Sequence, residues 1–99
     1  MKKGILDVCV LYALQNGESY GYKIINDLQG VIEISESTLY PILKRLEAGG
    51  FVTTRTAEYS GRLRRYYKIT NLGLKKFVAG RNDLLEINAI YKKIYGGRL

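Results

Sequence analysis

Residues 35–47 combine a regular apolar repeat with an outer surface of hydroxyl groups and cations. The apolar residues recur at i, i+3, i+4 and i+7, which is the spacing of one buried face of a helix. They are Leu39, Ile42, Leu43 and Leu46. The opposite side carries Ser37, Thr38, Pro41, Lys44 and Arg45. Such a helix, with Ser35 as its N-cap, is typical of helices that read DNA, and an ordinary amphipathic surface helix is the alternative.

The composition of the chain argues against catalysis and metal binding. Ninety-nine residues with 46% hydrophobic side chains and one proline predict a single folded domain. The sequence has no histidine and one cysteine, Cys9, so it lacks the commonest general base and cannot build a zinc site. It also lacks the common nucleotide-binding and nucleophile motifs. We therefore expect no enzyme activity, no cofactor and no metal.

The charge balance points to a polyanionic partner. Sixteen lysines and arginines stand against nine acidic residues, which gives a net charge of +7. Double-stranded DNA is the first candidate for such a partner, and an acidic membrane surface is the second.

Residues 5–14 are apolar at nearly every position. They are too few to span a bilayer, and no signal-peptide cleavage site follows, so we expect a buried helix in a cytoplasmic protein that does not enter a membrane. In so small a domain, a helix that is apolar all round needs cover from a second subunit. A central helix within a monomer is the alternative.

The middle of the chain predicts two further helices and a hairpin. Ser19 is a candidate cap for a helix through Leu28, and Gly49-Gly50 ends the helix that begins near Ser35. Residues 51–59 and 65–70 read as strands around a turn at residues 60–62. The turn and returning strand carry four cations without an acid between them, which suits a DNA-binding wing. These cations are Arg62, Arg64, Arg65 and Lys68.

Residues 71–95 predict a last helix with Thr70 as its cap. It would be about 37 Å long if Gly80 does not interrupt it. Its apolar stripe has no local surface to cover it, so we expect a two-fold symmetric homodimer formed by the first and last helices. The predicted interface residues are Ile5, Leu6, Val8, Cys9, Tyr12, Leu84, Ile87, Tyr91 and Ile94.

The predicted fold is mainly α with a small β-hairpin. The order is helix, helix, helix, strand, strand, helix, as in a winged helix-turn-helix. We expect a DNA-binding part over residues 1–70 and a dimerisation helix over residues 71–99, packed as one compact unit.

Several segments resemble the PadR family of bacterial transcriptional regulators, in its short form with one C-terminal helix. Tyr20-Gly21-Tyr22 opens the second helix, and a Ser-Thr-Leu-Tyr-Pro segment leading to Glu47 lies in the third. The Gly49-Gly50 cap and the basic turn at Gly61-Arg62 follow. The segment Arg65-Tyr66-Tyr67-Lys68-Ile69-Thr70 then leads to Gly73, and the resemblance covers about residues 4–95.

The resemblance implies a homodimer that places each third helix in a major groove of an inverted-repeat operator. The tip of the ribbon would then lie against the backbone or in the minor groove. Members of the family typically repress transcription, and several release DNA when a small aromatic effector binds near the dimer interface. Multidrug-sensing relatives stack such ligands on a tryptophan, whereas this chain has no tryptophan and carries Leu84 near that position.

The candidate DNA-binding residues fall into three groups. Hydroxyl groups near the start of the third helix can form hydrogen bonds with base edges or phosphates. We expect Arg45 to make a bidentate contact with guanine and Lys44 to contact a phosphate. Pro41 is expected to shape the start of the helix. The start of the preceding helix suits phosphates, with packing against the hairpin as the alternative for Tyr22. The ribbon suits phosphates or a narrow minor groove, with an ion pair to Glu58 as the alternative for Arg65. The candidates are Tyr20, Tyr22, Lys23, Ser37, Thr38, Tyr40, Pro41, Lys44, Arg45, Arg62, Arg64 and Arg65.

Two other functions fit the same pattern. A winged-helix module could bind a partner protein or act as an antirepressor without an operator. A small-molecule sensor without DNA binding is the other alternative.

Overall fold

A computed structural model describes residues 4–96, so the outermost residues of the two predicted parts, 1–3 and 97–99, lie outside it. The elements follow the predicted order of three helices, two strands and a helix. They are α1 (Ile5–Ala13), α2 (Gly21–Asp27), α3 (Glu36–Ala48), β1 (Val52–Tyr59), β2 (Arg62–Ile69) and α4 (Asn71–Tyr95).

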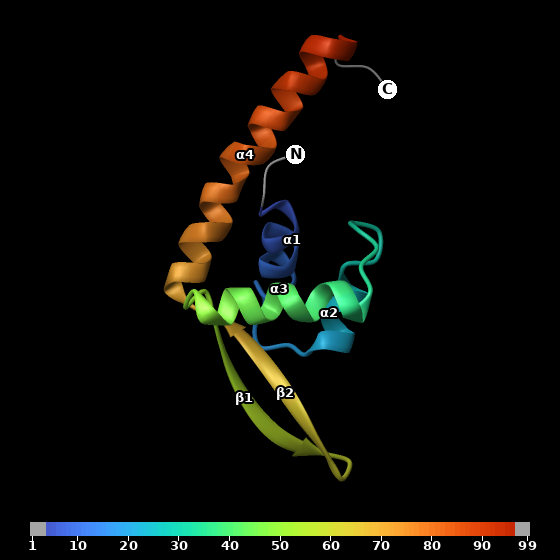
Figure 1. Cartoon of the computed structure of the whole chain (residues 1–99), viewed down its shortest axis with the longest axis vertical. Helices are drawn as coiled ribbons and strands as arrows, with labels where there is room; N and C mark the ends of the chain where they lie inside the picture. The colour runs from blue at the N-terminus through green and yellow to red at the C-terminus, as the bar shows by residue number, and fades with distance from the viewer. Residues whose placement is uncertain (1–3, 97–99) are drawn as a thin grey trace.

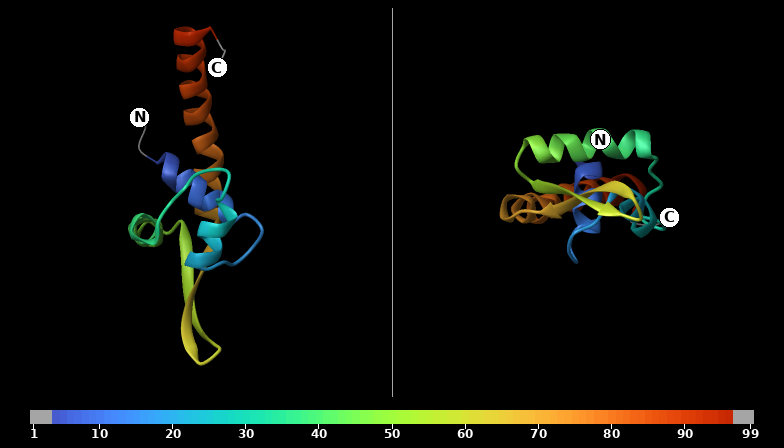
Figure 2. Two further views of the ribbon diagram at one scale, coloured as in Figure 1. Left: turned by 90° about the vertical axis from the view of Figure 1, so that its right-hand side faces the viewer. Right: turned by 90° about the horizontal axis from the view of Figure 1, so that it is seen from below.

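The elements form a small helical body with two projections. Figure 1 shows α3 lying across α1, with the hairpin pointing down and α4 rising above the body. The left view of Figure 2 shows that α4 and the hairpin extend in opposite directions. The molecule is therefore elongated, with principal extents of 54 × 25 × 22 Å.

The apolar core lies where α1, α2, α3 and the base of the hairpin meet. The predicted face of α3 is confirmed, because Leu39, Ile42, Leu43 and Leu46 are all buried. They pack in one cluster with Leu11 of α1 and other apolar side chains. Burying an aliphatic side chain of this size stabilises the fold by about 1.5–3 kcal/mol. The other members of the cluster are Val10, Leu14, Ile24, Leu28, Ile34, Val52 and Tyr67.

The hairpin is regular over its whole length. Its register runs from Val52 opposite Ile69 to Tyr59 opposite Arg62, so the returning strand begins at Arg62 and not at the predicted Arg65. Ser60 and Gly61 form the two-residue turn, and both have positive φ, at 50° and 77°. Two positive φ angles are typical of the type I′ turn, which matches the natural twist of paired strands.

Ser19 does not cap α2 as predicted. Its N–H and C=O instead pair with the backbone of Tyr67, at N···O distances of 2.9 and 2.7 Å. This isolated antiparallel β-bridge attaches the segment before α2 to the edge of β2. Tyr20 takes the N-cap position, and α2 ends at Asp27, one residue before the predicted Leu28. A serine before a helix and a serine in a single β-bridge look alike in sequence, and only the position of Tyr67 distinguishes them.

The helix α3 begins at Glu36, with Ser35 in the N-cap position as predicted. Pro41 therefore lies in the interior of the helix, and the prediction that it shapes the start of the helix was wrong. The Ser35 Oγ does not cap the backbone; it contacts Ser37 Oγ at 3.0 Å and Thr38 Oγ1 at 3.2 Å. Because proline has no N–H, the carbonyl of Ser37 has no helical donor, and both residues face the exposed side of the helix.

The α4 helix is continuous through Gly80. Thr70 caps it as predicted, accepting a hydrogen bond from the Gly73 N–H at 3.0 Å. Gly80 is buried against α1, where an added Cβ would lie only 2.3 Å from the Cγ2 of Val8. The glycine therefore serves the close approach of two helices and does not break one.

We expect Gly80→Ala to lower the melting temperature. In an unconstrained helix this change is stabilising by about 1 kcal/mol. Here the new methyl group meets the stiff Val8 side chain, and overpacking of this kind costs about 1–3 kcal/mol. After the helix-propensity gain is subtracted, the net loss is up to about 2 kcal/mol, and each kcal/mol lowers the melting temperature by roughly 4–8 °C in a domain of this size.

Thermal unfolding followed by circular dichroism measures the effect, with Val8→Ala alone as the control. The double variant Val8→Ala/Gly80→Ala should recover most of the loss. A single Gly80→Ala variant that melts above the wild type would contradict the proposed contact.

Candidate nucleic-acid interface

The outermost side chains of α3 are Ser37, Pro41 and Lys44, all of them exposed. They lie opposite the buried face, as the helical periodicity predicts. Within residues 4–96, Lys44 makes no ion pair, so its ammonium group is available to an anionic partner. Tyr40 is also exposed, and its hydroxyl lies over the first turn of α2, where a Cβ at Gly21 would lie 2.5 Å from it.

Arg45 lies at the edge of this outer face. Its guanidinium donates a hydrogen bond to the buried carboxylate of Asp7 on α1. The sequence analysis did not single out Asp7, because an acid in an apolar segment gives no sign of its partner 38 residues away. The guanine contact of Arg45 remains a prediction, and the carboxylate of Asp7 would compete with the base for the Arg45 guanidinium. Lys23 likewise pairs with Asp27, one helical turn along α2, at 2.9 Å.

A cleft of about 620 Å³ opens between the hairpin and the start of α2. Tyrosines and arginines dominate its walls, which makes it both aromatic and basic. The lining residues include six of the twelve predicted DNA-binding residues. These six are Tyr20, Tyr22, Tyr40, Arg62, Arg64 and Arg65.

Arg64 is held between two aromatic rings. Its guanidinium carbon lies 3.9 Å from the ring centroid of Tyr20 and 4.0 Å from that of Tyr59. The Tyr20 ring also meets Tyr66 edge to face, at 5.9 Å between centroids. Tyr20 thus packs against the hairpin, whereas Tyr22, for which such packing was the alternative, is 64% exposed. Cation–π contacts of this kind orient an arginine without neutralising its charge.

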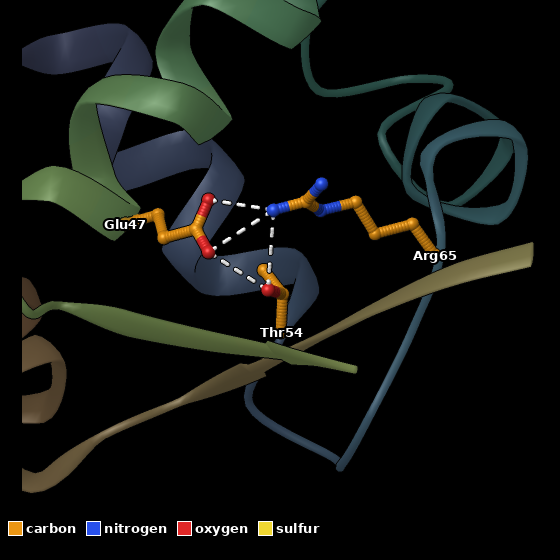
Figure 3. A network of polar contacts seen from close by, with 3 residues as sticks. All are labelled: Glu47, Thr54 and Arg65. Atoms are coloured by element: carbon orange, nitrogen blue, oxygen red, sulfur yellow. Dashed lines mark hydrogen bonds and ion pairs between the residues drawn. The ribbon is translucent and has the colours of Figure 1, made fainter. Parts of the chain in front are cut away.

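A polar network joins the end of α3 to the hairpin (Figure 3). The Thr54 hydroxyl donates to Glu47 Oε2 at 2.7 Å, and Arg65 Nη2 donates to both carboxylate oxygens at 3.0 and 3.1 Å. The alternative partner of Arg65 was therefore wrong, because Glu58 faces Leu63 in the register. The network holds the pKa of Glu47 below its usual value, chiefly through the Thr54 hydrogen bond and then through the Arg65 charge.

A second ion pair ties the hairpin to the loop before α2. Arg55 donates two hydrogen bonds of 2.6 Å to the carboxylate of Glu18, in a bidentate arrangement. These bonds lower the pKa of Glu18 and raise that of Arg55. Sequence reasoning missed this pair as well, since the two residues are 37 positions apart. The tip, in contrast, carries Arg62 without an ion pair anywhere in the described region.

The other notable surface is an apolar groove of about 520 Å³ between α1 and α4. Val8, Cys9, Tyr12 and Leu84, four of the predicted dimer residues, line it, and Tyr12 is 51% exposed. Burial raises the pKa of the Cys9 thiol, which keeps it in the neutral form. The other predicted interface residues are half-buried or exposed; they are Ile5, Leu6, Ile87, Tyr91 and Ile94.

Two negative findings apply to residues 4–96. Helices of that region are too short or too polar to cross a membrane. Nor do three or more histidine, cysteine or acidic side chains gather there in a way that could hold a metal ion.

Residues 10–79 match the transcriptional regulator PadR-like family. The chain belongs to this family of transcriptional regulators. The transcriptional regulator Rv3488 of Mycobacterium tuberculosis is 30% identical over 90 residues, which are 90% of this chain and 81% of that protein.

Solved structures extend the comparison to the fold. A transcriptional regulator from Clostridium thermocellum is 29% identical, with a TM-score of 0.85 over 94% of this chain and 95% of the other. Bacillus subtilis PadR, in a crystal structure with operator DNA, is 28% identical with a TM-score of 0.70. That match covers 76% of this chain and 45% of the longer PadR chain.

The membership confirms two predictions. The four helices and hairpin form the winged helix of PadR-like regulators, and the proteins of this family regulate transcription and are not enzymes. The identity of the DNA-contacting residues and of the interface residues remains a prediction.

We expect acid to weaken the attachment of the hairpin to α3. The pKa of Glu47 is lower in the folded chain than in the unfolded chain, so the carboxylate stabilises the fold above pH 4.5 and loses this contribution as pH falls through its folded pKa. Because the pair is partly exposed, the contribution at neutral pH is about 0.2–1 kcal/mol.

Urea unfolding at pH 7 and at acidic pH measures this contribution. Glu47→Gln should lower stability at pH 7 and flatten the pH dependence, while Glu58→Gln on the same hairpin should do neither. Equal effects of the two substitutions would show that the network in Figure 3 does not hold the hairpin.

Proposed function

We propose that this PadR-like regulator binds an inverted-repeat DNA operator as a homodimer and represses transcription. The observation that carries the proposal is the joint surface of α3 and the hairpin. An exposed helix face with Lys44 lies beside a basic cleft, and Arg62 extends the positive charge to the hairpin tip. A regulator with this target acts in the cytoplasm, where a bacterial chromosome lies.

In the proposed complex, α3 enters the major groove. Ser37, Thr38 and Tyr40, near its start, would donate or accept hydrogen bonds at base edges or phosphates. Lys44 would contact a phosphate and Arg45, if released from Asp7, a guanine. The exposed Tyr22 would reach the backbone from the first turn of α2, as the first helix of such motifs does.

The hairpin would lie along the DNA beside α3. Arg62 at the tip is the leading candidate for a phosphate or the minor groove. Arg65, paired with Glu47, would act mainly by holding the hairpin in place. Arg64, between its two tyrosine rings, would present a charge of fixed position, and Tyr20 would support it.

The homodimer rests on the uncovered apolar surface of α1 and α4. Exposed apolar side chains continue along α4 beyond the body of the domain, with Leu84 and Ile94 among them. A second copy would cover this surface together with the groove around Cys9 and Tyr12, and would place two α3 helices on one face of the DNA. In this proposal residues 1–70 carry the DNA-binding elements, and residues 71–99 supply the dimerisation helix, which holds the dimer together with α1.

The groove between α1 and α4 also suits the aromatic effector that the resemblance implies. Tyr12 and Phe77 supply aromatic walls, and Arg81 supplies a cation that would attract an acidic ring compound. Such an effector would act by changing how the two copies pack. Titrating the operator described below with and without a hydroxylated aromatic acid measures the effect of such a compound on operator affinity.

Operator binding should depend steeply on salt. The operator is obtained by selecting duplexes from a random library with the wild-type protein. The logarithm of affinity should fall linearly with the logarithm of salt concentration, by about 0.9 for each phosphate neutralised. In the homodimer each substitution removes one phosphate contact per subunit, so Lys44→Ala and Arg62→Ala should each reduce the magnitude of that slope by about 1.8.

Glu58→Gln serves as a surface control with an unchanged set of phosphate contacts. Failure of the wild-type protein to enrich any duplex would reject the proposed function. A partner protein that binds the α3 face, with no DNA affinity, would favour the protein-interaction alternative.

The dimer should depend on the apolar stripe of α4. We expect Leu84→Glu to produce monomers and to lower operator affinity by at least about tenfold, because a buried charge without a partner disfavours association. Ala89→Glu adds the same charge on the opposite, exposed side of α4 and should remain dimeric. Sedimentation equilibrium measures both, and a dimeric Leu84→Glu variant would contradict this interface.

A further inference from the structure

Three helices meet at the carboxylate of Asp7. Asp7 lies on α1 and is 5% exposed, which is rare for an acid. Arg45 of α3 donates to Oδ1, and the ammonium of Lys76 on α4 lies 3.9 Å from Oδ2. The carboxylate therefore links the DNA-facing helix to both helices of the proposed dimer.

The position of Arg45 on α3 agrees with this contact. At about 100° per residue, Arg45 lies roughly 100° around the helix from Lys44, at the edge nearest α1. Its side chain turns toward Asp7, while Lys44 stays on the outer face. A buried carboxylate that lost Arg45 would keep only the more distant Lys76, so the structure favours the arginine in its present place.

We propose that Asp7 and Arg45 are positioning residues that fix the angle between α3 and the α1–α4 pair. Arg45 then contributes to operator binding through the spacing of the two α3 helices in the dimer, and not through a guanine contact. This inference rests on the proposed function, because it concerns how a dimer fits its operator.

The spacing matters because a dimer must reach two half-sites at once. Half-sites on one face of DNA lie about 34 Å apart, one helical turn. The contact between Asp7 and Arg45 lies between the DNA-facing helix and the dimer contacts. If α3 tilts relative to α1 and α4 at this contact, the two α3 helices of the dimer move in opposite directions along the DNA. Binding to one half-site alone needs no such spacing.

The test compares two duplexes and three variants. The duplexes are the operator selected by the wild-type protein and a short duplex that holds one half-site. The variants are Asp7→Asn, Arg45→Gln and the double variant, with Lys44→Ala as the matched control. Circular dichroism confirms that each is folded at the temperature of the titration.

We expect both single substitutions to lower affinity for the full operator by about tenfold or more. The double variant should lose no more than either single variant, since the two residues act as one pair. On the half-site duplex, the loss should stay within about threefold, and the salt slope should match that of the wild type. Lys44→Ala should instead lower the slope on the half-site by about 0.9.

Opposite results would overturn the proposal. If Arg45 reads a base, Asp7→Asn frees it, so operator affinity stays the same or rises, while Arg45→Gln weakens even the half-site. Arg45→Lys covers the case in which Asp7→Asn does not fold. It keeps the ion pair and should bind the operator within about threefold of the wild type, whereas loss of a bidentate base contact would cost about tenfold or more.

A wild-type protein that selects no duplex would reject the proposed function and, with it, this role of the pair. That outcome differs from the failure of the inference alone, in which the wild type binds its operator and the variants depart from the expected pattern.

Discussion

The burial of one face of α3 decides what the rest of the molecule can do. Leu39, Leu43 and Leu46 pack on α1 and α2 with almost no exposed surface. A rotation of the helix by one residue, about 100°, would bring Lys44 toward the core, and an unpaired cation there is far costlier than an exposed one. The core therefore fixes which face of α3 is exposed, and the hairpin and α4 are placed around a helix whose rotation about its own axis is already set.

The parts of the fold that follow from local pattern were predictable. Helical spacing identified the buried face of α3, and strand-forming residues around Ser60-Gly61 identified the hairpin. One wrong prediction, for Ser19, and the open question, at Gly80, both fall where two distant segments meet. Ser19 pairs with Tyr67 and not with α2, and Gly80 lies against Val8, because the approach of another element decides their roles.

The candidate site shows the same division. The exposed residues Ser37 and Lys44 follow from the period of the helix. The partners of Arg45, Arg55 and Arg65 could not be predicted, because each bonds an acid far away in the sequence or on another element. A count of cations therefore overstates the charge available to DNA, since part of it already balances acids within the domain.

The hairpin is fastened at its base and unattached at its tip. Ser19, Glu18 and Glu47 hold the part of the ribbon near the body, while the register of the strands and the type I′ turn keep the remainder paired. Residues such as Arg62 and Leu63 therefore bear little of the folding energy. Substitutions at the tip can therefore change what the hairpin contacts while the fold is preserved, at small cost in stability.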